Sequence, residues 1–204
     1  WQQLMERLPT YFYHDGLAGY FPPDSLARER YSGSPVLTAY LLAVAHEAGY
    51  TIPEESRDCM LNALAGFVEG RVAQDKGIVP YWSPRPDLPQ RRLAAIEALS
   101  RYDRATPGHI ATVQITPGLW PTSSLIDWLS ILQRMPKLPA RAKQMQEVEN
   151  QLRTRMDAQG TMMRFNTEQT DFWWWMMASP DSNAVRGIAA LIDQIRARDA
   201  DLVG

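Results

Sequence analysis

Apolar and polar positions along the chain alternate with helical spacing from residue 34 onward. After Ser34 and Pro35, which suit an N-cap and a first helical position, no charged residue occurs before Glu47. The apolar residues between them predict a helix that is buried nearly all round. Gly49 suits the C-terminal cap of this helix because glycine accepts the left-handed conformation that such a cap needs.

The next stretch is amphipathic. Thr51 and Glu54 have the spacing of a capping box, and Glu55 would lie in the first turn of the helix that follows. One stripe is apolar and the opposite face is polar, which predicts a helix with one side in water. The apolar stripe comprises Met60, Leu61, Leu64, Phe67 and Val68, and the polar face comprises Arg57, Asp58, Asn62 and Glu69.

The same alternation continues to the end of the chain. Helical patterns cover residues 88–102, 106–115, 121–135, 138–157 and 179–195. Thr106 with Pro107, and Ser179 with Pro180, have the composition of helix starts. The pattern over 121–135 is apolar at Leu125, Ile126, Trp128, Leu129 and Leu132, whereas 138–157 carries a narrow stripe of Met145, Val148, Leu152 and Met156.

A short phrase of glycine and aromatic residues recurs between these helices. It reads DGLAGYF at residues 15–21, KGIVPYW at 76–82 and QGTMMRF at 159–165, and the weak strand signals of the chain are confined to it. Recurring phrases of this kind mark repeated supersecondary units. We therefore predict an all-α domain of helical hairpins, each with a more buried and a more exposed helix, arranged as an α/α toroid. A flat α-solenoid is the alternative, although the spacing of the phrases fits no standard solenoid period.

Length, charge and cysteine content limit the kinds of protein that this chain can be. The 204 residues suit a single domain over 1–204, and the start at Trp1 without a signal segment suggests a partial toroid cut from a longer chain. A net charge of −2 lacks the excess of basic residues that is typical of nucleic-acid-binding proteins. No window is apolar over the roughly 20 residues of a membrane span. One cysteine excludes an internal disulfide and a multi-thiolate zinc site.

The run of large apolar residues at 172–177, FWWWMM, admits three interpretations. It is a core segment, a surface covered by a partner, or a platform for sugars. Burial stabilises each large side chain by roughly 1.5–3 kcal/mol, whereas an exposed patch invites aggregation. We expect the tryptophans at 173–175 to be mainly core.

The residues that could act in catalysis or bind a metal each fit an ordinary structural role as well. None of the histidines, His14, His46 and His109, has a second ligand at metal-binding spacing. Cys59 lies beside the apolar stripe of its helix with no cation next to it, which predicts a half-buried structural thiol. Three carboxylates lie near the glycine-aromatic turns, where two of them could act as an acid–base pair on a polysaccharide: Asp15, Asp24 and Asp171. Asp15 and Asp171 also fit turn and cap roles. We expect no catalytic, cofactor-binding or metal-binding residue.

Two blocks of the sequence resemble the bacterial alpha-2-macroglobulin family. The first, residues 15–55, has the phrase DGLAGYF followed by LTAY and by GYTIP, and the second, residues 173–192, has an aromatic stretch followed by SPDSNAVR. The resemblance implies the toroidal thioester-type domain of that family. It also implies endopeptidase inhibition by entrapment of a protease, for a protein of the periplasm or cell envelope. In many members a Cys-x-Glu-Gln thioester then captures the target covalently.

This chain departs from the family at the thioester. Cys59 is followed by Met60, Leu61 and Asn62, and the only Glu-Gln pair, at 168–169, follows Asn-Thr. No thioester residue can therefore be assigned here, and the family motif normally lies upstream of the first phrase. We predict a non-enzymatic part of an alpha-macroglobulin-like protein, whose partners would be proteases, other domains of the same polypeptide and envelope proteins. The alternatives are a toroid hydrolase or lyase that acts on a polysaccharide, and an interaction module that uses the tryptophans.

Overall fold

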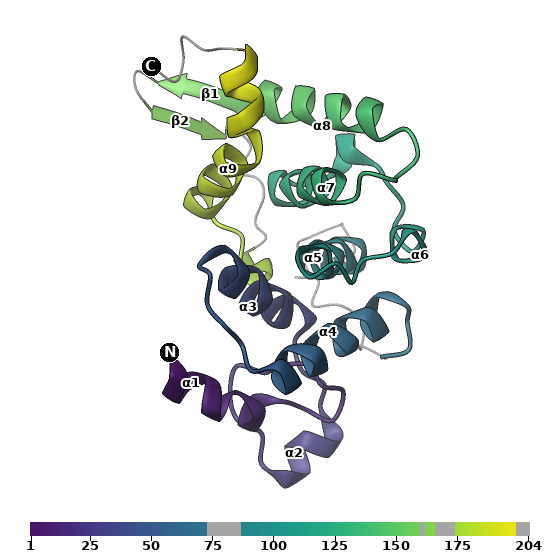
Figure 1. Cartoon of the computed structure of the whole chain (residues 1–204), viewed down its shortest axis with the longest axis vertical. Helices are drawn as coiled ribbons and strands as arrows, with labels where there is room; N and C mark the ends of the chain where they lie inside the picture. The colour runs from purple at the N-terminus through teal and green to yellow at the C-terminus, as the bar shows by residue number, and fades with distance from the viewer. Residues whose placement is uncertain (73–86, 160–161, 166–173, 199–204) are drawn as a thin grey trace. The chain divides into compact units, whose positions relative to one another are not determined.

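The computed structural model describes residues 1–72, 87–159, 162–165 and 174–198, mainly as helices joined by turns (Figure 1). The chain divides into two compact units, Trp1–Gln114 and Ile115–Gly204. One two-stranded hairpin is the sheet structure of the described residues, so the predicted all-α class is confirmed. The toroidal arrangement and the single domain over 1–204 stay predictions. Within the described ranges, no helix has the length and hydropathy that crossing a bilayer requires.

The first unit is built on three packed helices. They are α3 (Pro35–Glu47), α4 (Glu54–Val68) and α5 (Leu88–Arg101), and each contacts the other two. Smaller elements flank them: α1 (Gln2–Arg7), η1 (Leu8–Tyr11), α2 (Ser25–Arg30) and α6 (Pro107–Ile110). The core consists of fully buried aliphatic and aromatic side chains from these three helices, among them Leu42, Met60, Leu64, Phe67, Leu93, Ile96 and Leu99.

Helix α3 begins and ends as predicted but is less buried. The Ser34 side chain accepts a hydrogen bond from the Leu37 N–H, and Gly49 has a φ of +67° just beyond the last turn. Tyr40 and Val44, however, are 46% and 42% exposed, so the prediction of burial nearly all round is wrong. The physical reason is that burial depends on which elements pack against a helix. Helix α3 packs on α4 and α5, while Tyr40 and Val44, four residues apart on one face, stay exposed.

The start of helix α4 differs from the predicted capping box. The N-cap is Pro53, with no side-chain cap, and Thr51 lies outside the helix. A residue that precedes proline is driven to extended backbone, so Ile52 cannot continue a helix back to Thr51. The Thr51 carbonyl instead accepts a hydrogen bond of 2.7 Å from the Trp1 indole. The predicted apolar stripe of α4 is confirmed, since all five of its residues are buried.

The second unit is centred on α7 (Thr122–Arg134), which contacts both α8 (Arg141–Arg155) and α9 (Pro180–Arg198). The predicted apolar residues of α7 are all buried, and Trp128 packs edge-on against Trp120. Two short 3-10 turns complete the unit, η2 (Pro117–Leu119) and η3 (Trp174–Met176).

The sheet hairpin of the second unit carries the third glycine-aromatic phrase. Strand β1 (Met156–Gln159) pairs antiparallel with β2 (Met162–Phe165), with Met156 opposite Phe165. The sequence predicted that Met156 extends the apolar stripe of the helix over 138–157, and this is wrong: α8 ends at Arg155, and Met156 starts a strand. Phe165 packs against α9 where Gly187 leaves room, since a Cβ there would lie 2.8 Å from the Phe165 ring. The first phrase forms an isolated bridge between Phe12 and Ala18, and the second lies outside the described residues.

Candidate functional site

The first glycine-aromatic phrase forms a tight turn. Gly16 has a φ of +76°, which favours glycine, and its N–H donates to the Tyr13 carbonyl at 3.0 Å. The Tyr13 N–H in turn donates to the Leu17 carbonyl at 3.0 Å. Two main-chain hydrogen bonds therefore close this turn.

The carboxylate of Asp15 joins this turn to the segment before α3. It accepts hydrogen bonds from the Leu17 N–H at 3.0 Å and from the Gly33 N–H at 3.2 Å. Gly33 approaches so closely that an added Cβ would lie 2.3 Å from the Leu17 carbonyl oxygen. Asp15 thus serves as a brace between two stretches of backbone.

Thr38 completes the connection from inside the unit. Its hydroxyl accepts the Ala18 N–H at 2.9 Å and donates to the Ser34 carbonyl at 2.8 Å. The Ser34 N–H donates a hydrogen bond to the Ala18 carbonyl at 2.8 Å. Thr38 itself is fully buried. The phrase at 15–21 and the start of α3 are therefore one hydrogen-bonded assembly, in which polar side chains serve buried backbone groups.

The other predicted carboxylates do not join Asp15. Asp24 is the N-cap of α2 and accepts the Ala27 N–H at 2.7 Å, while Asp171 lies outside the described residues. Asp15 therefore has the turn role expected of it, and Asp24 has a cap role of the same kind, which the sequence interpretation did not assign to it. A pair of carboxylates facing a shared cavity, which glycoside hydrolysis requires, is not what these two residues form.

Cys59 contacts the same turn. The thiol is half-buried, as predicted, and donates to the Gly16 carbonyl at 3.8 Å. Burial raises the pKa of Cys59, and the nearby charges of Asp15 and Glu55 raise it further. A nucleophilic cysteine needs the opposite shift, because the thiolate is the reactive form.

The histidines lie apart and each has a local partner. The His14 Nδ1 lies 3.1 Å from the Arg28 carbonyl, and His46 packs edge-on against Tyr102 at 5.4 Å between ring centroids. His109 is buried beside Glu69. No cluster of three or more metal-ligating side chains occurs within the described ranges.

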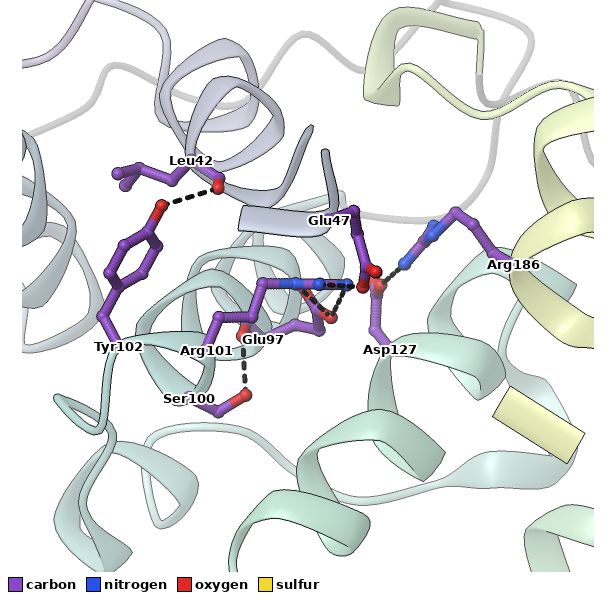
Figure 2. A network of polar contacts seen from close by, with 8 residues as sticks. All are labelled: Leu42, Glu47, Glu97, Ser100, Arg101, Tyr102, Asp127 and Arg186. Atoms are coloured by element: carbon purple, nitrogen blue, oxygen red, sulfur yellow. Dashed lines mark hydrogen bonds and ion pairs between the residues drawn. The ribbon is translucent and has the colours of Figure 1, made fainter. Parts of the chain in front are cut away.

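A charged network that the sequence analysis missed lies at the end of α5 (Figure 2). Arg101 donates from Nε to both carboxylate oxygens of Glu97, at 2.9 and 3.0 Å, and from Nη1 to Glu47 of α3. Burial alone would lower the pKa of Arg101, but the two carboxylates outweigh it and raise the pKa. The spacing of Glu97 and Arg101, four residues apart on a helix, was the available signal.

Tyr102 adds a second link from the same end of α5 to α3. Its hydroxyl donates to the Leu42 carbonyl at 2.9 Å (Figure 2), and burial raises the pKa of the phenol. Together with the ion pairs of Arg101, this bond fixes the packing of α3 against α5. The network is a structural tie between two helices.

The second block starts helix α9. The Ser179 hydroxyl accepts the Ser182 N–H at 3.1 Å, and the Ser182 hydroxyl accepts the Ser179 N–H at 2.9 Å. Four residues beyond Ser182, Arg186 pairs with Asp127, a buried residue of α7 (Figure 2). Asp127 could not be singled out from the sequence, since its partner lies far along the chain.

The tryptophan run is described only in part, because residues 172 and 173 lie outside the described ranges. Trp175 is half-buried, and the backbone at Met177 has a φ of +56° just before α9. The side chains of the two preceding tryptophans are not among those described. The prediction that the run is mainly core stays a prediction.

Comparisons with known proteins give one distant likeness. The sequence matches no model of a known protein family and no curated protein. The chain is similar in structure to the native conformation of E. coli alpha-2-macroglobulin, with a TM-score of 0.45 and 18% sequence identity. The similar region covers 72% of this chain and 9% of that one. These values describe a distant resemblance and do not establish a common family.

Proposed function

We propose that this chain is a non-catalytic structural part of an alpha-macroglobulin-like protein that entraps proteases at the bacterial cell envelope. The proposal takes its family from the two sequence blocks, residues 15–55 and 173–192, whose order and separation match that family. The all-α architecture is compatible with it. The whole protein would supply the protease-contacting parts, and this chain would supply a scaffold.

The observation that carries the non-catalytic role is how the polar residues of the two blocks are used. In the first block, Asp15, Asp24 and Thr38 each accept backbone N–H groups. In the second block, Ser179 and Ser182 cap a helix. Groups that must accept or release protons in a reaction need access to a substrate, whereas these groups hold the backbone.

Covalent capture through this chain is not part of the proposal. The thioester of the family needs a cysteine joined to a glutamine in a Cys-x-Glu-Gln sequence, which this chain lacks. The raised pKa of Cys59 also keeps the thiol protonated at neutral pH. The intact mass should therefore equal the sequence mass, and Cys59 should react with a thiol reagent after unfolding without prior treatment with methylamine.

The test of entrapment uses the complete protein that contains this chain. It is incubated with an active endopeptidase, and cleavage of a large protein substrate is compared with cleavage of a small chromogenic peptide. Entrapment predicts that the large substrate is protected while the small one is still cleaved, because a caged active site stays open to small molecules. Equal cleavage of both substrates, with and without the protein, would reject the proposal.

The location is tested separately, by fractionating cells that express the complete protein. Recovery with periplasmic or envelope markers is expected. The alternative function, a hydrolase or lyase, is tested by screening this chain against peptidoglycan and common polysaccharides. Turnover that disappears in Asp15→Asn would put the enzyme first.

A further inference from the structure

The segment that leads out of the first unit is fastened by hydrogen bonds to that unit. It comprises α6 and the residues after it, up to Gln114, beyond which the second unit begins. The His109 ring lies 3.2 Å from the Glu69 carboxylate at the end of α4. Arg92 of α5 donates to the Thr112 carbonyl at 3.3 Å. We refer to these two contacts and the N-terminal cap of α6 as the connector clasp.

The cap of α6 depends on the protonation state of His109. The Thr106 hydroxyl accepts the His109 N–H at 3.2 Å, and the His109 Nδ1 accepts the Thr106 N–H at 3.3 Å. A ring nitrogen that accepts a backbone N–H cannot itself carry a proton. The proton of the neutral ring is therefore on Nε2, which donates to Glu69.

The charges around this ring come from the elements packed against it. Glu69 faces Nε2, and Arg71 pairs with the same carboxylate, with 2.6 Å between Arg71 Nε and Glu69 Oε2. The hydrogen bonds from Arg71 and His109 lower the pKa of Glu69, so its carboxylate stays ionised where an imidazole titrates. Arg92 brings a second cation from α5.

We propose that the connector clasp is a proton-sensitive fastening, which opens when His109 takes up a second ring proton. The imidazolium has two N–H donors, so its Nδ1 would face the Thr106 N–H as donor against donor. The Glu69 side of the ring keeps its hydrogen bond in both protonation states. The cap side cannot keep its bond, whatever the pH at which the proton arrives.

Loss of this half of the capping box matters because α6 has only 4 residues. The Thr106 hydroxyl would still accept the His109 N–H, but the Thr106 N–H would lose its acceptor. The main-chain bonds of α6, from Ile110 to the Thr106 carbonyl and from Ala111 to the Pro107 carbonyl, belong to a single turn. A single turn has little stability of its own, so each capping bond counts. Opening the turn would loosen the attachment of residues 106–112 to the first unit.

The matched variant is His109→Gln. Glutamine at this position of a capping box accepts the N-cap N–H and does not titrate. Hydrogen exchange of the Thr106, Ile110 and Ala111 amides is measured at about pH 8 and about pH 5. At each pH, the protection of an amide in the wild type is divided by its protection in the variant. This ratio removes the intrinsic pH dependence of exchange. His14→Gln, which removes an exposed histidine, is the control variant.

The proposal predicts that wild-type protection relative to His109→Gln falls by about fivefold or more on acidification, the size of one lost cap. A ratio that stays the same although nitrogen NMR shows His109 to be protonated at the lower pH would overturn it. A second measurement uses the wild type alone: nitrogen NMR shows which ring nitrogen of His109 carries a proton. The neutral form should carry its proton on Nε2, and loss of Thr106 protection should follow protonation of Nδ1. A proton on Nδ1 in the neutral protein would also overturn the proposal.

Discussion

Two helices of this chain begin with the same dipeptide, Ser-Pro, and are fastened in different ways. At α3, Ser34 caps the Leu37 N–H, and the next turn supplies Thr38, whose buried hydroxyl holds the Ala18 N–H of a distant turn. At α9, Ser179 and Ser182 cap each other reciprocally near the surface. The polar attachment of α9 to its unit includes the pair of Arg186, one turn further on, with Asp127, and a hydrogen bond of 2.7 Å from the Gln133 side chain to the Ala190 carbonyl.

A helix-start pattern in the sequence therefore predicts where a helix begins. It does not predict which residues attach the helix to the rest of its unit. At the start of α3 the attachment consists of hydrogen bonds that the Thr38 hydroxyl and the Asp15 carboxylate accept from backbone N–H groups, and such bonds are costly to leave unmade. At the start of α9 the local cap is exposed, and an ion pair on α7 is part of the attachment. Substitutions in the two regions should therefore differ in size in a defined order.

The largest effect should come from the close backbone approach in the first region. Gly33→Ala places a Cβ 2.3 Å from the Leu17 carbonyl oxygen, so backbone must move. We expect a loss of about 3 kcal/mol or more in the free energy of unfolding by urea. Gly49→Ala is the control, because its Cβ would meet nothing within 4 Å and its positive φ alone should cost about 1 kcal/mol. Equal losses in the two variants would show that the approach at Gly33 is not rigid.

The next effect concerns the ion pair of the second region. Arg186→Met leaves the Asp127 carboxylate, whose side chain is 8% exposed, without the guanidinium. Because the Arg186 side chain is 35% exposed, we expect about 2–3 kcal/mol of destabilisation, less than for a fully buried pair. Adding Asp127→Asn to this variant should recover part of the loss. A double variant less stable than Arg186→Met would argue against the pair as the source.

A smaller effect should follow from removing the Thr38 hydroxyl while keeping its shape. Thr38→Val leaves the buried Ala18 N–H without its acceptor, which should cost about 1–2 kcal/mol. Thr38→Ser keeps the hydroxyl and is the matched control, with a loss of less than about 1 kcal/mol. Urea unfolding of both variants separates the hydrogen bond from the packing. A valine variant as stable as the serine variant would contradict the account.

The smallest effect should come from the exposed reciprocal cap. Ser182→Ala removes the two hydrogen bonds that the Ser182 hydroxyl makes with the Ser179 backbone, and because this cap is exposed we expect a loss of about 0.5 kcal/mol. Ser34→Ala should cost about 1 kcal/mol, because its helix is also held by Thr38. A larger loss for Ser182→Ala than for Ser34→Ala would reverse the comparison between the two regions.

Helix existence and most helix starts could be predicted from the sequence because they depend on local spacing and composition. The starts at Ser34, Thr106 and Ser179 were of this kind. The start of α4 was missed because proline at 53 overrides the capping spacing of Thr51. The exposure of Tyr40 and Val44 was missed because burial depends on which neighbours pack against α3.

The structural roles at the candidate site were partly predictable. Turn and cap roles for Asp15 and Asp24 follow from residue type and position, and both are observed. The link from Asp15 to Gly33 and the pair of Arg186 with Asp127 join residues far apart in sequence. No local pattern encodes such pairs, so only the folded chain reveals them.

The bracing role that the polar residues of the first block have in the structure is best tested at Asp15, whose carboxylate joins two stretches of backbone. Asp15→Asn keeps the size of the side chain but replaces one acceptor oxygen by a donor that would face the Leu17 or Gly33 N–H. The account predicts that the variant is less stable than the wild type by about 1–2 kcal/mol in urea unfolding. Removal of a functional group from an active site commonly leaves stability unchanged or raises it. An Asp15→Asn variant as stable as the wild type, or more so, would contradict the account.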